Sequence, residues 1–263
     1  MHRYRITDLI IYPIKSLGGI SVSECAVQTR GFEHDRRWML IDEKGQFMTQ
    51  RENAQLALFS CKMQESQIEV GYKNEKCHFD INQVQEDSTR VQVWSSKLKA
   101  QEVSPKISEW FSEHLGVPTT LVKMTTISKR LRRLFRSPFK TELSFADGYP
   151  YLVLGHESMN HLNAKLEVPV DINRFRANIL VDTSSPHEED KWPDFDLGTA
   201  RMKIIKGCAR CVVTTIDQED GTKGKEPLKT LASYRMRRKK IYFGANAIVL
   251  KEGHVGVGDW VKV

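Results

Sequence analysis

The sequence has few cysteines and no long apolar run, and each absence argues against a class of protein. Five cysteines among 263 residues is a sparse and odd count, whereas small secreted domains rely on dense, paired cysteines. No apolar run approaches the ~20 residues of a membrane-spanning helix. Residues 1–5 lead straight into an alternating pattern and lack the apolar core of a secretory signal. We therefore expect a cytoplasmic protein with reduced thiols and no membrane partner.

The chain carries more positive than negative charge. Forty lysines and arginines against 33 acidic residues give a formal net charge of +7, which favours an anionic partner. The sequence has no zinc-finger, RNP or basic amphipathic-helix pattern, so we do not expect a nucleic-acid partner. A β-barrel that binds nucleic acid remains an alternative that rests on charge alone, and its affinity would fall steeply with salt. A phosphorylated ligand or an acidic protein fits the charge equally well.

Short alternating segments predict that the first half of the chain is mainly β. Residues 4–13 are expected to form a strand that stops at proline, and residues 37–50 a hairpin that turns at Lys44–Gly45. The other expected elements are strands at 67–72, 89–94 and 119–124 and a helix at 104–115. Because short strands with turns between them are typical of barrels and sandwiches, we place a β-barrel-like domain before a boundary near residue 120.

The second half mixes strands with two short helices. The expected elements are helices at 156–166 and 227–234 and strands at 173–182, around 204, and at 211–216, 247–250 and 260–263. His156 and His161 stand five residues apart and so share no helix face, which argues against a metal site there. The predicted fold class is mainly β with a few helices (α+β), divided into residues 1–120 and 121–263.

Cys208 and Cys211 form a C-x-x-C motif with Arg210 between them. A neighbouring guanidinium favours the thiolate, which is the form that binds metals. A zinc site would need two more ligands, and the other cysteines are scattered. A thioredoxin-like pair should open a helix, whereas the β-branched residues 212–216 follow. We favour one metal-ligating thiolate with a structural second cysteine, and the zinc and redox interpretations stay open.

Four further segments carry groups that suit an anion. Residues 12–19 (Y-P-I-K-S-L-G-G) end a strand with a lysine, a hydroxyl and glycine backbone, as a phosphate requires, although no Walker A motif is present. Residues 31–38, 147–150 and 173–178 place arginine, glycine or an amide at a strand edge, although each alone is commonly a surface group or a turn. Residues 129–136 (KRLRRLFR) are either a solvated basic loop or the edge of an anion or acidic-partner site.

The order of these segments resembles a known family. The segments Y-P-I-K-S, G-F-E-H-D-R-R-W, R-F-R-A-N, C-A-R-C-V-V-T-T-I-D and F-G-A-N are similar to those of MOSC-domain proteins with an N-terminal MOSC β-barrel domain. They look most like the molybdenum-cofactor branch that includes the mitochondrial amidoxime-reducing component and its bacterial relatives. The resemblance implies an N-terminal barrel domain over 1–120 packed on a MOSC β-barrel domain over 121–263. It also implies bound molybdenum cofactor (Mo-molybdopterin), and the family is associated with pyridoxal phosphate binding.

The resemblance assigns the metal end of the site. Cys211 matches the cysteine that ligates molybdenum, and Arg210 matches its basic neighbour. Cys208 matches no ligand and is expected to be structural. Arg176 and Asn178 match pterin contacts near the metal, so the implied catalytic residues are Cys211, Asn178 and Arg210.

The remaining cofactor-binding positions are implied in the same way. Lys15, Ser16 and Arg36 match positions that hold the pterin phosphate and ring. Gly148 and Tyr149 match a segment that meets the cofactor largely through its backbone. Asn246 stands where the mitochondrial members have a tyrosine, so that contact is a departure from the family pattern.

The resemblance implies an oxidoreductase that reduces N-hydroxylated compounds, such as hydroxylaminopurines or amidoximes, and so detoxifies N-hydroxylated bases. Many bacterial relatives continue into a plant-type ferredoxin domain, whereas this sequence ends at Val263. Electrons are therefore expected from a separate [2Fe–2S] ferredoxin-like protein or a flavoprotein, which basic residues at 129–136 or 235–240 could dock. The alternative is a non-catalytic module that binds the molybdenum cofactor or a sulfur carrier.

Overall fold

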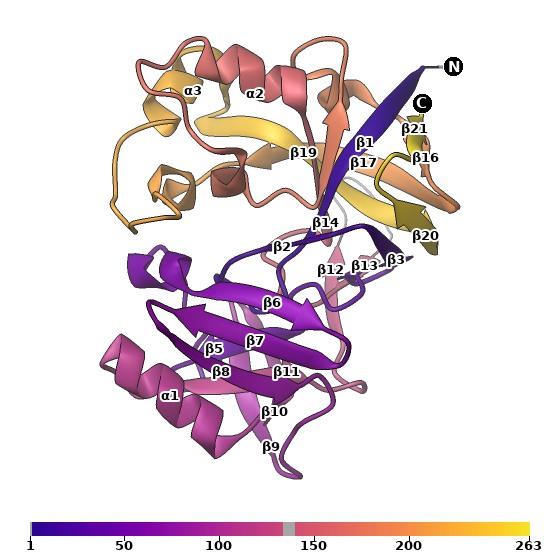
Figure 1. Cartoon of the computed structure of the whole chain (residues 1–263). Coiled ribbons are helices and arrows are strands. Elements are labelled where there is room, and N and C mark those ends of the chain that lie inside the picture. The colour runs from indigo at the N-terminus through magenta and orange to yellow at the C-terminus, as the bar shows by residue number, and fades with distance from the viewer. Residues whose placement is uncertain (1, 134–139) are drawn as a thin grey trace.

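The computed structural model describes residues 2–133 and 140–263, and these residues form two β-rich bodies (Figure 1). The lower body in Figure 1 is built from the purple and magenta segments and holds α1. The upper body holds α2, α3 and most of the orange and yellow strands. The indigo strand β1 runs into the upper body, and both ends of the chain lie there. No helix within the described ranges is both long and apolar enough to cross a membrane.

The upper body is a closed barrel. Its seven strands pair in a ring, because β14 pairs with β19 at one end of the order and with β15 at the other. The ring order is β14 (Tyr151–Gly155), β15 (Ile179–Asp182), β1 (Arg3–Ile11), β21 (Trp260–Lys262), β16 (Asp194–Leu197), β17 (Ala200–Ala209) and β19 (Lys240–Lys251). Strands β2 (Ile20–Val22) and β18 (Met236–Arg237) extend this sheet at β1 and β19. A closed ring leaves no unpaired edge among its seven members.

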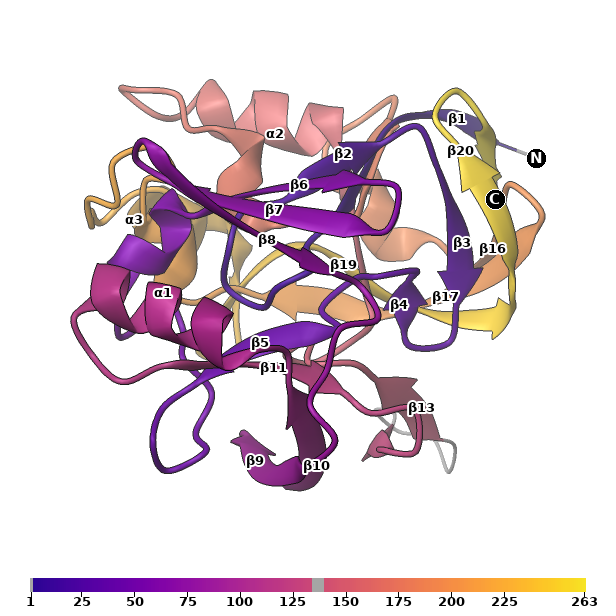
Figure 2. The same cartoon turned by 60° about the horizontal axis from the view of Figure 1, so that its bottom comes forward.

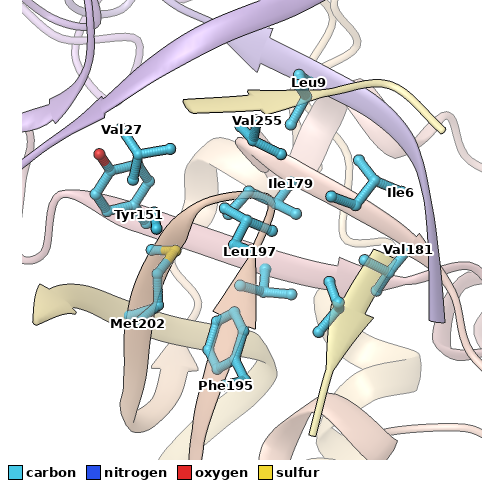
Figure 3. Packing of buried hydrophobic residues seen from close by; sticks show 14 of the residues in the cluster. Ile6, Leu9, Val27, Tyr151, Ile179, Val181, Phe195, Leu197, Met202 and Val255 are labelled. Carbon is cyan, nitrogen blue, oxygen red and sulfur yellow. The ribbon is translucent and has the colours of Figure 1, made fainter. Parts of the chain in front are cut away.

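Alternating apolar residues fill the barrel. Figure 3 shows Ile6 and Leu9 of β1 together with Ile179 and Val181 of β15, and all four are fully buried. Phe195 and Leu197 of β16 belong to the same cluster. Because successive strand residues point to opposite faces, the i and i+2 pairs of β15 and β16 lie on the inner face. Ile6 and Leu9 are three residues apart, and the register of β1 shifts between Ile6 and Asp8. The predicted strand at 4–13 is therefore confirmed in type, with β1 ending at Ile11.

The lower body consists of two small sheets and a helix (Figure 2). One sheet has the order β5 (Trp38–Ile41), β11 (Thr120–Met124), β10 (Ser96–Glu102) and β9 (Ser88–Val93). The other has the order β6 (Ser60–Gln64), β7 (Gln67–Tyr72) and β8 (Glu75–Asp80). Helix α1 (Pro105–Leu115) buries Ile107, Phe111 and Leu115 against this core, and Gly116 ends it in the left-handed conformation, as predicted. Together these elements make the expected β-barrel-like unit, a half-barrel.

Short strands and helices connect and cover the two bodies. Strand β3 (Glu24–Gln28) pairs with β4 (Gly31–Phe32) and β20 (Gly253–Gly256), and β12 (Arg130–Arg133) pairs with β13 (Lys140–Leu143). Helix α2 spans His156–Asn163 and α3 spans Leu228–Arg235, close to the helices predicted at 156–166 and 227–234. His156 and His161 contact different neighbours, since His156 bonds Thr7 and His161 packs against Tyr234.

Three predicted strand segments are wrong in part. Residues Ile172–Phe175 form a 3₁₀ helix where the predicted strand at 173–182 was to begin, because the Asp171 side chain accepts the backbone N–H of Asn173 at 2.6 Å and starts the turn. Residues 212–215 also form a 3₁₀ helix, because Thr214 and Thr215 donate their hydroxyls to carbonyls three residues back. The predicted hairpin at 37–50 has a first arm, β5, but its second arm makes only an isolated bridge to it.

Candidate functional site

A cavity of about 410 Å³ is lined by residues from both halves of the chain. All ten positions predicted as site residues lie on its wall, although they come from six separate segments. These residues are Lys15, Ser16, Arg36, Gly148, Tyr149, Arg176, Asn178, Arg210, Cys211 and Asn246. The fold thus brings together in one cavity all ten residues that the family resemblance implied as site residues.

The cavity wall is strongly basic. Among the described residues that line it, eight are lysine or arginine and one, Asp147, is acidic. The basic residues are Lys15, Arg36, Arg51, Arg132, Arg174, Arg176, Lys206 and Arg210. A concave surface with one sign of charge concentrates ligands of the opposite sign. The cavity is therefore suited to an anion that carries more than one negative charge.

Lys15 lies at the inner end of a charge network. Its ammonium is buried, donates to the carbonyl of Phe145 at 2.9 Å and forms a salt bridge with Asp147. Asp147 also accepts from Arg51 at 2.8 Å and from the indole N–H of Trp94 at 3.2 Å. Burial lowers the pKa of Lys15 to about 8, against the opposing effect of Asp147. Burial opposes ionisation of Asp147, but Lys15 and Arg51 hold its pKa well below the usual range.

Ser16 follows Lys15 in an unusual backbone conformation. Its φ is 72°, a left-handed value that non-glycine residues seldom adopt. The carbonyl of Ser16 accepts from the Gln50 side chain at 2.7 Å, and its hydroxyl donates to the Met48 carbonyl at 3.3 Å. The hydroxyl is thus held at the cavity wall beside Lys15 by the segment after β5.

Arg36 and Arg176 flank the ring of Tyr12. Their guanidinium carbons lie 4.4 Å and 4.2 Å from the ring centroid, and both residues have positive φ, 51° and 53°. Arg36 binds the buried Asp35 at 2.6 Å, and Arg176 donates to the carbonyl of Leu17 at 2.7 Å. Burial lowers the pKa of Arg176 to about 10, so it still carries its charge at neutral pH. Backbone strain of this kind clusters at functional sites.

Asn178 is hydrogen-bonded to Arg36, one member of this arginine pair. Only 1% of the residue is exposed, and its amide donates to Ile10 at 3.0 Å and to Asp35 at 3.2 Å. Its side-chain oxygen accepts from Arg36 at 3.0 Å. Both the nitrogen and the oxygen of the Asn178 amide are thus already hydrogen-bonded within the protein. These contacts are those of a residue that orients Arg36, whereas the sequence predicted a catalytic role for Asn178.

The C-x-x-C motif lies where β17 ends. Arg210 donates to the carbonyls of Phe243 at 2.8 Å and Phe175 at 2.9 Å, while its Nη2 is buried and has no hydrogen-bond partner among the described residues. Cys211 caps the 3₁₀ helix at 212–215 and is partly exposed. Cys208 packs at the edge of the core around Phe175 and Phe243. Cys208 and Cys211 are both free thiols.

Arg51 interacts electrostatically with Cys211. Burial lowers the pKa of Arg51, but Asp147 and then Cys211 outweigh that effect and raise it. The described residues contain no group of three histidine, cysteine or acidic side chains that could hold a metal ion. The zinc interpretation therefore lacks its remaining ligands there. The redox interpretation lacks its helix, because a 3₁₀ turn follows the motif.

Tyr149 also lines the cavity. It is buried, and Arg132 lies 5.0 Å and Lys206 5.3 Å from its ring centroid. A Cβ added at Gly148 would meet only the Arg132 side chain, at 3.9 Å. Asn246 donates to the carbonyl of Gly207 at 3.4 Å. Paired cations over one aromatic ring add positive charge beside the backbone of 148–149.

The basic run at 129–136 divides between two environments. Arg130 is buried and donates to the carbonyls of Ser144 and Ala146, while Arg132 lines the cavity. Residues 134–136 of the run lie outside the described residues. The described part is thus more than a solvated loop, since Arg132 lines the basic cavity.

Sequence reasoning missed four cavity residues that matter for its chemistry. They are Arg51, Trp94, Arg132 and Lys206. Lys206 lies two residues before the C-x-x-C motif, and Arg132 lies in the basic run at 129–136. Both could therefore have been predicted from their neighbours in the sequence. Arg51 and Trp94 lie within turns, and no sequence pattern pointed to either residue.

A barrel joined to a half-barrel, with a basic cavity lined by the two thiols of a C-x-x-C motif, defines the class of protein. Residues 3–118 match the MOSC N-terminal beta barrel domain, and residues 140–262 match the MOSC domain. The chain belongs to the MOSC-domain family.

Relatives within this family cover nearly the whole chain. The chain is 32% identical over 275 residues to mitochondrial amidoxime reducing component 2 of Bos taurus, covering 97% of this chain and 81% of that protein. It is 28% identical over 275 residues to component 1 of Mus musculus, covering 97% and 80%. It is 31% identical over 284 residues to the molybdenum cofactor sulfurase of Oryza sativa subsp. japonica, covering 98% of this chain but only 34% of that protein. The chain thus spans about a third of the sulfurase.

Proposed function

We propose that the protein is a molybdenum-cofactor-dependent reductase of N-hydroxylated compounds such as hydroxylaminopurines and amidoximes. The observation that carries this proposal is the placement of two partly exposed thiols, Cys208 and the family-matched Cys211, in a cavity whose wall bears eight basic side chains. Molybdopterin combines a dithiolene with a terminal phosphate. A soft thiolate suits molybdenum, and lysine and arginine suit the phosphate.

The donor groups present fit such a ligand. Nη2 of Arg210 and Nε of Arg132 are buried without a hydrogen-bond partner in the described part of the chain. Buried donors are almost always paired, so each orphaned donor calls for an acceptor that the polypeptide does not supply. Both arginines line the cavity. An anionic heterocycle rich in oxygen and nitrogen acceptors would satisfy them.

Separate parts of the wall would hold separate parts of the cofactor. Lys15, Ser16 and Arg36 would bind the phosphate and ring, and the backbone at 148–149 would meet the pterin. Arg176 would bind near the metal, with Asn178 fixing the neighbouring Arg36. Asn246 would replace the contact that mitochondrial relatives make with a tyrosine. Arg210 would neutralise charge beside Cys211, whose thiolate would ligate molybdenum.

Bound molybdenum would supply the two-electron chemistry. Reduction of a hydroxylamine consumes two electrons and two protons, breaks the N–O bond and releases the amine and water. The chain's own contribution is to orient the substrate, exclude water and hold charge. Arg51 and Arg210 would place positive charge beside Cys211. Electrostatic positioning of this kind is the share of catalysis that a protein contributes to a cofactor.

Electrons would come from a separate [2Fe–2S] ferredoxin-like protein or a flavoprotein with an acidic face. The turn between β18 and β19 exposes four consecutive cations, Arg237–Lys240. Lys240 acts electrostatically on Lys206 of the cavity wall, and the carbonyl of Ile241 accepts the backbone N–H of Arg210 at 2.8 Å. This basic turn thus lies close in the structure to the motif that holds Cys211, where complementary charge would guide an acidic donor.

A non-catalytic role is the second candidate. The match to a molybdenum cofactor sulfurase of which this chain spans about a third favours a module that binds the cofactor or a sulfur carrier within a larger process. Such a module would load the cofactor but would turn over no N-hydroxylated substrate with any donor.

Elemental analysis tests the proposal first. Protein from a host that makes the cofactor should contain near-stoichiometric molybdenum, Cys211→Ala should lose it, and Cys208→Ala should keep it. Wild type should then reduce a hydroxylaminopurine with a ferredoxin or flavoprotein donor. Molybdenum without turnover across several donors would favour the carrier, and equal molybdenum in Cys211→Ala would refute the assigned ligand.

A further inference from the structure

Trp94 is an exposed aromatic residue at the cavity wall that the assigned cofactor contacts do not use. It follows β9, lines the cavity and is 45% exposed. Its φ is 56°, a left-handed value that is a genuine outlier for a bulky side chain. Strained backbone at a bulky residue persists only where the surroundings fix it, and it gathers at sites of function.

Three contacts fix the indole ring. Its N–H donates to Asp147 at 3.2 Å, the Arg51 guanidinium lies 4.8 Å from its centroid, and the Phe47 ring lies 5.0 Å away at 57°. An exposed ring that served only packing would have no need of such anchoring. The arrangement resembles a preformed wall whose position is set before any ligand arrives.

The position of Trp94 separates it from the inner wall. Lys15 is 5% exposed, Asn178 1% and Tyr149 8%, and the other residues assigned to the cofactor are partly buried rather than exposed. Trp94, with almost half of its surface exposed, lies at the rim that a substrate meets on entry. Indole presents a broad π-face, which stacks on any planar heterocycle regardless of its hydrogen-bond pattern.

The geometry points to Trp94 as a specificity residue that stacks the planar aromatic ring of the substrate at the cavity rim. This inference rests on the proposed function and adds a substrate preference to it. A hydroxylaminopurine or an aromatic amidoxime would gain the stacking contact, whereas a small aliphatic hydroxylamine would not. Asp147 and Arg51 act as positioning residues for the ring.

The test compares Trp94→Ala and Trp94→Phe with wild type in the cofactor-loaded protein. Two substrates are used, a hydroxylaminopurine and N-methylhydroxylamine, and the ratio of their kcat/KM values is measured. Stacking of one base on an aromatic ring predicts that Trp94→Ala lowers the purine-to-aliphatic ratio about tenfold, mainly through KM for the purine, and that Trp94→Phe keeps most of it. Trp260→Ala is the matched control, because Trp260 is 46% exposed and does not line the cavity.

Two results would overturn the inference. One is an unchanged ratio in Trp94→Ala. The other is loss of molybdenum from Trp94→Ala, which would place the stacked ring on the cofactor.

A binding experiment separates this inference from the proposed function. Adenine, the amine product, should quench tryptophan fluorescence in wild type but not in Trp94→Phe, even if no donor supports turnover. Equal quenching in both proteins would also refute the stacking role.

Discussion

The guanidinium of Arg51 lies 2.8 Å from the carboxylate of Asp147 and interacts electrostatically with Cys211. The three residues come from distant parts of the sequence. Arg51 therefore links the only acidic residue that lines the described cavity wall to the proposed metal ligand. We infer that Arg51, held by Asp147, acts as a positioning residue for Cys211.

Substituting Arg51 should weaken cofactor retention. Loss of a group that orients a metal ligand typically costs about 10–100-fold in metal affinity, so Arg51→Ala should lose most of its molybdenum on dialysis. Arg51→Lys should lose less, because lysine keeps the charge but not the planar fork. Arg90→Ala, on the exposed part of β9, is the control. Wild-type molybdenum content in dialysed Arg51→Ala would contradict this role.

Anion binding by the cofactor-free protein should depend on the charge of Lys15. Because burial lowers the pKa of Lys15 to about 8, its ammonium is lost as the pH rises through that value. Sulfate, which stays fully charged over this range, should bind more weakly at pH 9.5 than at pH 6.5 by calorimetry. Lys15→Arg should remove much of the drop, since guanidinium stays charged. A pH-independent affinity in wild type would show that Lys15 does not contact the anion.

Acid should destabilise the protein through His187. Burial, with Arg235, His161 and Arg237 nearby, lowers the pKa of His187 to about 4. Both its ring nitrogens lack a partner among the described residues. The folded state thus binds fewer protons than the unfolded state between about pH 6.5 and pH 4, so stability is present above this window and falls as the pH falls through it.

Urea unfolding at pH 7 and pH 5 measures this effect. The urea concentration at the unfolding midpoint should fall less between pH 7 and pH 5 for His187→Asn than for wild type. His254→Asn, at an exposed position, should behave like wild type. An identical pH dependence in wild type and His187→Asn would show that other groups control the acid response.

Charge reversal on the basic turn should weaken docking of the electron donor. Arg237→Glu with Arg238→Glu should raise the KM for an acidic ferredoxin or flavoprotein and flatten its dependence on salt, because rim charges mainly set the association rate. The kcat with a small chemical reductant should not change. Lys62→Glu, exposed on β6 of the lower body, is the control. A donor KM that is the same in all three proteins would exclude this surface.

The site was largely predictable from the sequence because its residues follow strand ends. Lys15 and Arg210 each stand just beyond or at the end of an alternating apolar segment, so a strand prediction also places a functional group at a sheet edge. Arg51 and Trp94 could not be found in this way. Each reaches the cavity only because the lower body folds against the barrel, and no local pattern records that contact.

The elements that the sequence mispredicted share a physical cause. Residues 212–215 have the β-branched composition of a strand and residues 172–175 include Ile172 and Phe175, yet side chains that bond nearby backbone groups turned both segments into 3₁₀ structure. Both turns border the cavity, where Arg174, Arg176 and Cys211 line the wall. The division of the chain at residue 120 stays a prediction.

The place of β1 in the barrel has a consequence for how the chain can be cut. Leu9 of β1 pairs with Ile179 of β15, and Tyr4 pairs with Val261 of β21. A fragment that began after residue 120 would therefore expose the apolar strand edges of β15 and β21, and unpaired edges invite intermolecular pairing. It would also have to close its barrel without the strand that is synthesised first. Such a fragment should aggregate, and adding a peptide that spans residues 3–11 should restore its solubility.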